Sequence, residues 1–172
     1  MVKAALAGVA VLVAIAAVVT AIGWRLPVRH RVEREAVFPI AREGLFALLS
    51  DVERFAEWRS GMKRVERRPA VDGRARWLEA GGDGEILYEL VESVPGERLV
   101  TRIADPRLPF GGTWTYELAD AELGGAGRGT RLRITEDGEV FNPVFRFISR
   151  FVFGHGRTIE RYLADLETVA LR

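Results

Sequence analysis

The sequence contains no cysteine and only two histidines, and these absences exclude several kinds of chemistry. Without cysteine there are no disulfides, no thiol nucleophile and no thiolate metal site. The two histidines, His30 and His155, lie far apart in the sequence and do not form a cluster of metal ligands. No motif places a histidine beside a serine, as a Ser-His-Asp arrangement would require. We therefore expect neither a bound metal nor a cofactor.

An excess of charge of one sign is also missing, because 25 basic and 24 acidic residues give a net charge of +1. A protein with this balance has no overall electrostatic attraction to nucleic acid. Basic residues do gather between residues 63 and 76, but Glu66 and Asp72 lie among them, which is typical of a solvated surface. The glycine-rich segment 124–129 lacks the Lys-Ser/Thr pair of a phosphate-binding loop, and we interpret it as a flexible hairpin connection. Nucleic acid is not expected as a partner.

Charge is absent altogether from residues 4–24, which are apolar except for Thr20. At about 1.5 Å per residue, a helix of this length reaches about 30 Å, the thickness of a hydrocarbon core. We predict that residues 1–25 form a single-pass transmembrane anchor with Trp24 at the interface. The alternative is a cleaved signal peptide, with Lys3 as its basic start and residues 19–21 as the cleavage site. The apolar run is long for a signal peptide, which favours the anchor.

The distribution of basic residues around this stretch predicts its orientation. Lys3 stands alone before the stretch, whereas Arg25, Arg29, Arg31 and Arg34 follow it. Loops rich in Lys and Arg remain on the cytoplasmic side of a membrane. We therefore expect residues 26–172 to form one domain on the cytoplasmic side.

The first two thirds of this domain have the pattern of an antiparallel sheet. A strand is predicted at residues 29–38, two short helices follow it up to Gly61, and six further extended runs are separated by turn residues. Apolar and polar side chains alternate along these runs, so one face of the sheet should be apolar and the other solvated. The predicted apolar face contains Ile86, Tyr88, Leu90, Trp114, Tyr116, Leu118, Leu132 and Ile134. The predicted solvated face contains Glu85, Glu89, Thr113, Thr115, Glu117, Arg131 and Arg133.

The last 31 residues, 142–172, are predicted to form a long helix that covers the apolar face. Asn142 can cap this helix and Pro143 fits its first turn. Apolar residues at steps of three and four define one face: Val144, Ile148, Val152, His155, Ile159, Tyr162, Leu166 and Val169. The Gly154-His155-Gly156 triplet predicts a bend. The half before the bend is apolar nearly all round, which indicates contact with a ligand or a bilayer, because it also carries Phe147, Phe151 and Phe153.

This order of elements resembles the START-like or SRPBCC superfamily, which includes the Bet v 1-like and the polyketide cyclase/dehydrase-like proteins. The residues that carry the resemblance are 50–58, 112–116 and 130–143. The resemblance implies an α+β helix-grip fold, in which a curved antiparallel sheet wraps around the C-terminal helix and leaves a cavity between them. Members of the superfamily commonly bind lipids, sterols or polyketides in that cavity, and only some of them are enzymes.

We expect aromatic and apolar side chains to line such a cavity: Trp58, Trp77, Tyr88, Trp114, Tyr116, Phe145 and Ile148. The first hypothesis is a membrane-anchored module, not an enzyme, that binds a hydrophobic or amphipathic, lipid-like small molecule through a portal formed by the phenylalanines. The second is a cyclase/dehydrase-type enzyme that uses His155 with Tyr88 or Tyr116 as acid–base groups. A histidine at such a position is more often a packing residue than an acid–base group. The third is a scaffold that acts through partners and has no ligand.

Overall fold

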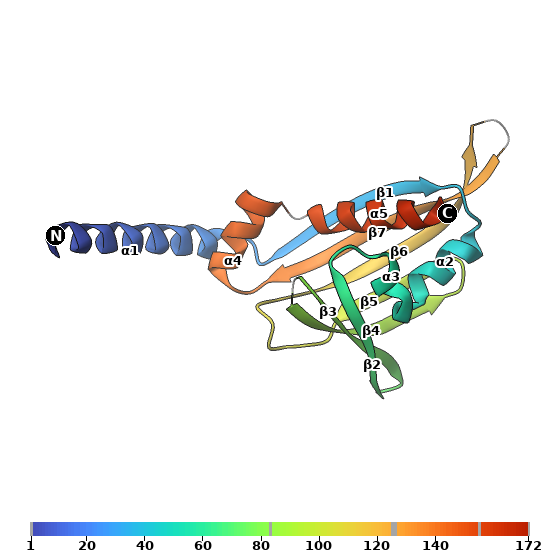
Figure 1. Cartoon of the computed structure of the whole chain (residues 1–172), viewed down its shortest axis with the longest axis horizontal. Helices are drawn as coiled ribbons and strands as arrows, with labels where there is room; N and C mark the ends of the chain where they lie inside the picture. The colour runs from blue at the N-terminus through green and yellow to red at the C-terminus, as the bar shows by residue number, and fades with distance from the viewer. Residues whose placement is uncertain (1, 83, 125–126, 155, 172) are drawn as a thin grey trace.

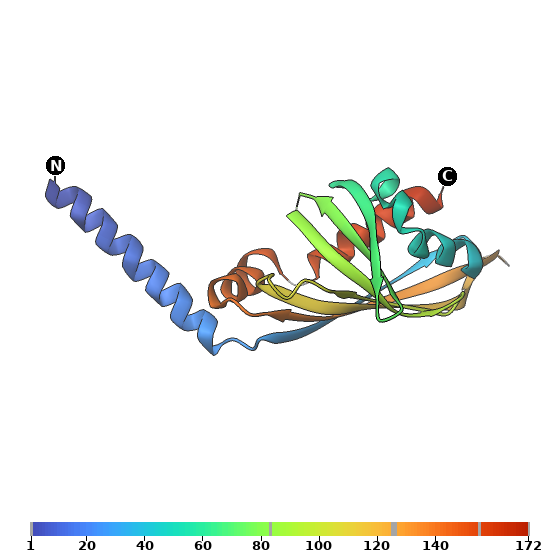
Figure 2. The same cartoon turned by 90° about the horizontal axis from the view of Figure 1, so that it is seen from below.

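The computed structural model describes residues 2–82, 84–124, 127–154 and 156–171. Helix α1 (Val2–Arg25) extends away from the rest of the chain, and its segment Leu6–Arg25 is long and apolar enough to cross a membrane (Figure 1). The remaining elements form a curved seven-stranded sheet with helices on its concave side (Figure 2). The α+β helix-grip fold predicted from the sequence is therefore confirmed.

The sheet is antiparallel throughout and has the order β1-β7-β6-β5-β4-β3-β2. Its strands are β1 (Arg29–Phe38), β2 (Met62–Val71), β3 (Arg74–Gly81), β4 (Gly84–Val94), β5 (Arg98–Ile103), β6 (Phe110–Leu123) and β7 (Gly127–Val140). Between β1 and β2 lie α2 (Arg42–Ser50), the short 3-10 turn η1 (Val52–Arg54) and α3 (Phe55–Trp58). The first strand pairs with the last, from Arg29 opposite Glu139 to Phe38 opposite Thr130.

The pairing confirms the predicted alternation of the two faces. Tyr116 lies opposite Ile134 on the inner face, whereas Glu117 lies opposite Arg133 on the outer face. Directly opposed residues of an antiparallel pair share a face, so the two sets extend across the sheet. The core lies on the inner face, where α2 and α5 (Arg157–Ala170) pack, and contains Phe38, Leu45, Leu49, Leu99, Leu118, Leu132, Ile159, Tyr162 and Leu166.

The C-terminal segment differs from the single long helix predicted. It consists of α4 (Pro143–Ile148), the π-helical turn η2 (Ser149–Phe153) and α5, and the chain leaves the helical conformation at Gly154, whose φ is 74°. The cap at Asn142 is as predicted, since its side chain accepts hydrogen bonds from the backbone of Val144 and Phe145. However, α4 lies beside α1 and not on the sheet (Figure 2). The predicted inward face is therefore buried only in α5, and Val144 and Val152 are exposed.

The connection between β6 and β7 is shorter than the predicted 124–129 loop. Pairing continues to Leu123 opposite Gly127, so residues 127–129 belong to β7. Glycine is needed at position 129, because a Cβ there would overlap with the carbonyl oxygen of Phe38. Residues 127–129 are thus part of the sheet, and the glycine at 129 has a steric reason.

Candidate functional site

A partly enclosed cavity of about 110 Å³ lies between the inner face of the sheet and the helices α2, η1 and α3. Four of the residues predicted to line it do so, namely Trp77, Tyr88, Trp114 and Tyr116. The rings of Trp77 and Tyr88 are stacked, with centroids 5.9 Å apart. Aromatic side chains of β3, β4 and β6 therefore form the aromatic wall of the cavity on the sheet side, with Leu99 and Thr101 of the intervening strand β5 between them.

The other predicted lining residues lie elsewhere. Trp58 does not line the cavity. It packs edge-on against Phe55 and Tyr162, at ring-centroid distances of 5.5 and 5.3 Å. Phe145 and Ile148 lie on α4, outside the lining of this cavity, because α4 docks on α1 and leaves the sheet uncovered there. His155 lies outside the described residues.

We expected the C-terminal helix to form the helical side of the cavity, but other helices form it. The residues that line the cavity from the helical side are Leu49, Ser50, Val52 and Phe55, whereas no residue of α5 lines it. Tyr162 of α5 instead packs against the rings of Trp114 and Tyr116, at centroid distances of 5.7 and 5.8 Å. The C-terminal helix supports the aromatic wall and fills the space where a larger cavity was expected.

A buried ion pair forms part of the same wall. The guanidinium of Arg59 donates a hydrogen bond to Glu79 across 2.8 Å, and only 19% and 8% of the two side chains are exposed. Trp77 Nε1 donates to the other oxygen of Glu79 across 2.9 Å. The guanidinium also lies over the rings of Phe55 and Tyr162, about 5 Å from each centroid. Burial is the largest influence on Arg59 and disfavours its charge, but Glu79 and the nearby tyrosines together outweigh it and raise the pKa of Arg59.

The buried tyrosines remain neutral at physiological pH. Burial raises the pKa of Tyr116 and of Tyr162 well above the ordinary value of a phenol. Tyr116, which lines the cavity, therefore presents a protonated hydroxyl beside a permanently charged guanidinium. An aromatic cavity with one cationic donor and one neutral hydroxyl can hold an apolar group that carries a polar or anionic substituent.

The opening of the cavity lies at the end of the sheet remote from α1. The exposed lining residues are Ser50, Arg67, Ala75 and Ser93. Ser93 lies beside the β4–β5 turn, whereas α1 joins β1 at the opposite end, where β7 ends and the β5–β6 loop lies (Figure 1). Phe147 and Phe151 do not line this cavity, and a portal at these phenylalanines stays a prediction.

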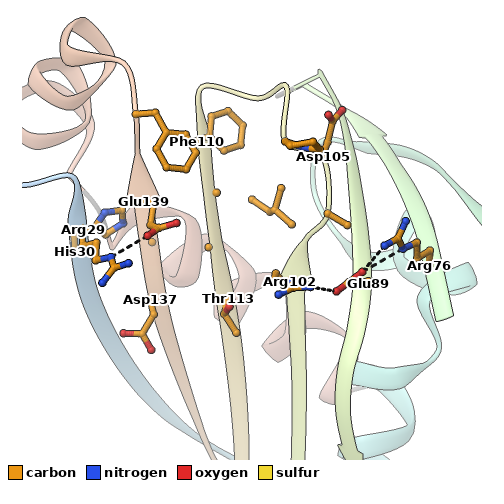
Figure 3. Close-up of a pocket in the computed structure, with 17 residues that line it drawn as sticks. Arg29, His30, Arg76, Glu89, Arg102, Asp105, Phe110, Thr113, Asp137 and Glu139 are labelled. Atoms are coloured by element: carbon orange, nitrogen blue, oxygen red, sulfur yellow. Dashed lines mark hydrogen bonds and ion pairs between the residues drawn. The ribbon is translucent and has the colours of Figure 1, made fainter. Parts of the chain in front are cut away.

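A second, more open concavity of about 710 Å³ lies at the end of the sheet near α1 (Figure 3). Its most buried charge is Glu89, which is 1% exposed although the sequence predicted it on the solvated face. Arg76, Arg102 and Arg74 surround this carboxylate, and Arg29 is likewise paired with Glu139 (Figure 3). Because these arginines are paired with carboxylates, we interpret the cluster as a structural link between β3, β4 and β5. Among the described residues there is no group of three or more His, Cys, Asp or Glu that could hold a metal ion.

The comparison with known families decides what kind of domain this is. The family described as "Polyketide cyclase / dehydrase and lipid transport" matches residues 29–170. The chain belongs to this family. The matched segment begins with β1 and ends with α5, so the family domain contains the whole sheet and the cavity and excludes α1. The resemblance to the START-like or SRPBCC superfamily is thereby confirmed.

Solved structures with the same fold are distant in sequence. A START superfamily protein from Mycobacterium smegmatis is 17% identical, with a TM-score of 0.63, over 83% of this chain and 97% of that one. The ZhuI aromatase/cyclase from a Streptomyces species is 14% identical, with a TM-score of 0.64, over 84% and 94% of the two chains. A protein from Thermus thermophilus is 21% identical, with a TM-score of 0.62, over 83% and 97%. No curated protein matches the sequence. These similarities show the fold of the family member and leave its ligand to be argued from the cavity.

Sequence reasoning missed the polar part of the cavity. A signal for Glu79 was present, because it lies two residues after Trp77 in one strand and must share its face. Arg59 follows the end of α3, where no periodicity indicates the direction of a side chain. The docking of α4 on α1 could likewise not be predicted from periodicity, because it depends on the break in the helical segment at Gly154.

Proposed function

We propose that this family member is a membrane-anchored binding module for a hydrophobic or amphipathic, lipid-like small molecule, held in the cavity behind Trp77, Tyr88, Trp114 and Tyr116. The observation that carries the proposal is the aromatic wall with the ion pair Arg59–Glu79 set into it. Pockets for small molecules are mostly apolar and contain a few polar groups that fix orientation. Arg59 and Tyr116 supply such groups here.

The size of the cavity limits what it holds. Its volume of about 110 Å³ is below the roughly 300–1,000 Å³ of common ligand pockets. A single ring or a short acyl segment fits, and a whole lipid requires the side chains of the rim to move. A ligand with a polar or anionic group next to such an apolar segment satisfies both the aromatic wall and the guanidinium of Arg59.

The membrane anchor in this proposal is α1. Its side chains from Leu6 onward are almost all exposed in the protein, and a span of 20 apolar residues is stable only when lipid or protein covers it. The arginines that follow α1 favour a cytoplasmic domain. The proposal therefore predicts that the full chain remains in the membrane pellet after alkaline carbonate washing. A mature chain that begins at Ile22 would instead show that residues 1–21 are a signal peptide.

Native mass spectrometry of the full chain, released from nanodiscs, tests the cavity directly. We expect a co-purifying small molecule that is lost when Ala75, at the rim, is changed to Trp. Ala75→Trp should narrow the opening at little cost in stability, because the side chain is exposed at the rim. The matched control is Ala70→Trp on the neighbouring strand, which adds the same ring outside the cavity lining. Ligand occupancy unchanged in Ala75→Trp would refute binding at this site.

The second candidate is an enzyme of the cyclase/dehydrase type, and the pair Arg59 and Tyr116 favours it. A permanent cation and a neutral hydroxyl in an apolar wall can both donate to a carbonyl oxygen as it gains negative charge. The solved aromatase/cyclase shares the fold. Turnover of a poly-β-ketone substrate that is lost in Tyr116→Phe and retained in Tyr162→Phe would support this function. Binding without turnover supports the module.

A further inference from the structure

Helix α4 and the turn η2 carry a cluster of large apolar side chains that no described part of the protein covers. Phe145 is 50% exposed, Phe151 60% and Val152 61%, and Val144 is also exposed. Val144 and Phe145 lie in the first turn of α4, and Phe151 and Val152 lie in η2, which follows α4 directly, so the exposed side chains belong to one short helical segment. We call these four residues the α4–η2 surface. Soluble proteins rarely expose such a contiguous apolar patch without a partner.

The position of this surface is fixed by a tight joint between α4 and the end of α1. Gly23 of α1 lies directly against the carbonyl group of Pro143, where a Cβ would overlap with the oxygen atom. Glycine at this position therefore allows the two backbones to meet. Figure 2 shows α4 beside the C-terminal end of α1, on the side toward which the sheet extends. The α4–η2 surface is thus held next to the last turns of the apolar helix.

The side chain of Arg146 connects the two elements by hydrogen bonds. It is only 7% exposed, and its guanidinium donates to the carbonyl oxygens of Leu26 at 2.9 Å and of Phe141 at 3.1 Å. It also lies over the ring of Trp24, 5.9 Å from the centroid. A cation at the C-terminal end of α1 is favourable because unpaired carbonyl groups face it there. The joint therefore behaves as a part of the folded domain and not as a flexible linker.

We propose that the α4–η2 surface lies in the interfacial layer of the bilayer that α1 crosses, so that the domain has a second, non-spanning membrane contact. This inference rests on the anchoring role proposed above for α1 and is independent of ligand binding. Trp24 and Arg25 mark the end of the apolar span, where aromatic and basic residues meet lipid headgroups. The joint at Gly23 and Arg146 places the α4–η2 surface at the same depth as Trp24 and Arg25.

The composition of the segment matches a lipid surface better than a protein partner. Residues 141–154 contain Arg146 and Arg150 but no aspartate or glutamate. Arg150, directly before Phe151 in the sequence, is exposed and can meet anionic headgroups. An apolar helical face with a basic edge is typical of helices that lie in the plane of a membrane interface. Such a contact would prevent the domain from pivoting about residues 26–28.

Because the sequence has no cysteine, single cysteines can report the depth of each site in the full chain. We would label Phe145→Cys and Val152→Cys with an environment-sensitive fluorophore and reconstitute the protein in vesicles of phosphatidylcholine and phosphatidylglycerol. Val13→Cys in α1 serves as the embedded control, and Val71→Cys at the exposed end of β2 as the aqueous control. Lipids with a spin label near the headgroup quench interfacial probes, whereas iodide quenches probes in water.

The expected result is a shift to shorter emission wavelength, with quenching by the spin-labelled lipid and protection from iodide, at positions 145 and 152 but not at 71. Iodide quenching at 145 and 152 equal to that at 71 would overturn the proposal. Protection from both quenchers would assign the surface to a protein partner or a second copy and would also overturn it. A probe at position 13 that iodide quenches as strongly as the probe at 71 would refute the anchoring by α1 itself, which separates the two failures.

Changing the joint provides a second measurement. Gly23→Leu introduces a side chain where the carbonyl group of Pro143 lies, so α4 must move away from α1. We expect the probe at 145 to lose most of its lipid quenching in this variant, whereas the probe at 13 stays protected from iodide. Gly8→Leu, which meets open space in α1, is the matched control. If Gly23→Leu and Gly8→Leu leave the quenching at 145 equally unchanged, the joint does not set the position of the surface.

Discussion

Arg59 and Glu79 form an ion pair across 2.8 Å within an otherwise aromatic wall, and both side chains are largely shielded from water. A buried charge that loses its partner destabilises a protein strongly, because the remaining charge has neither water nor a counter-ion. A substitution that removes one of these two charges from the cavity should therefore also lower the stability of the domain.

Glu79→Leu should lower the free energy of unfolding by about 3 kcal/mol, because it leaves the guanidinium of Arg59 unpaired. Thermal unfolding of the full chain in detergent, followed by circular dichroism, measures the loss. The control is Glu85→Leu, which removes a partner of Arg64 from an exposed pair and should cost less than about 1 kcal/mol. The double variant Arg59→Met/Glu79→Leu should recover most of the stability. Equal losses for Glu79→Leu and Glu85→Leu would contradict the burial of the pair.

The carboxylate of Glu89 predicts a dependence of stability on pH. Burial alone would raise its pKa, but hydrogen bonds from Arg102 and Arg76 outweigh that effect and hold the pKa below its ordinary value of 4.5. The unfolded chain therefore takes up the proton first, so this stabilisation is complete above pH 4.5 and is lost as the pH falls through the lower, folded-state pKa. Glu89→Gln should cost about 2 kcal/mol at pH 7.

Unfolding by urea at several pH values tests this linkage. The difference between the wild type and Glu89→Gln should shrink as the pH is lowered below 4.5. A difference that stays constant from pH 7 to pH 3 would show that the charge of Glu89 does not contribute.

Two adjacent glycines at the start of β6 should respond differently to the same change. Gly112 has a φ of 148°, and a Cβ there would lie 2.7 Å from the carbonyl oxygen of Asp137. At Gly111 the nearest atom would be 3.6 Å away, on the ring of Phe141. We expect Gly112→Ala to destabilise the domain by more than about 1 kcal/mol, and Gly111→Ala to change it little. Equal melting temperatures for the two variants would contradict the strained conformation at Gly112.

The orientation of the chain can be tested in membrane vesicles. If the arginines after α1 govern topology, a cysteine at Val71 should react with a membrane-impermeant thiol reagent in inside-out vesicles but not in right-side-out vesicles. Val13→Cys, which lies within α1, should react in neither. Labelling of Val71→Cys in right-side-out vesicles would place the domain on the opposite side of the membrane.

Local sequence patterns were sufficient for the order of the elements and for the faces of the sheet. The alternation around Tyr116 and Ile134 predicted their shared face, because side chains in a strand alternate with a period of two. The cap at Asn142 was predicted for the same kind of reason, since it depends only on the following two or three residues.

The features that could not be predicted depend on contacts between distant segments. Glu89 is on the outer face, as expected, but arginines from two neighbouring strands cover it, which alternation alone does not indicate. The apolar residues of α4 were recognised as unusual, yet their position beside α1 depends on the joint between Gly23 and Pro143. The cavity was expected against the C-terminal helix, but Tyr162 fills that space and leaves room only near α2 and α3.

The pairing of the first strand with the last also constrains how the domain is made. Within the sheet β1 pairs only with β7, and the paired residues Arg29 and Glu139 are separated by 110 positions. During synthesis β1 emerges early, directly after the apolar helix, and has no strand to pair with until residues 127–140 have also emerged. Contacts of such long sequence separation form slowly, and an unpaired strand is open to association with other chains in the meantime. This edge of the sheet can therefore close only after most of the chain has left the ribosome, when α1 has long been available for insertion.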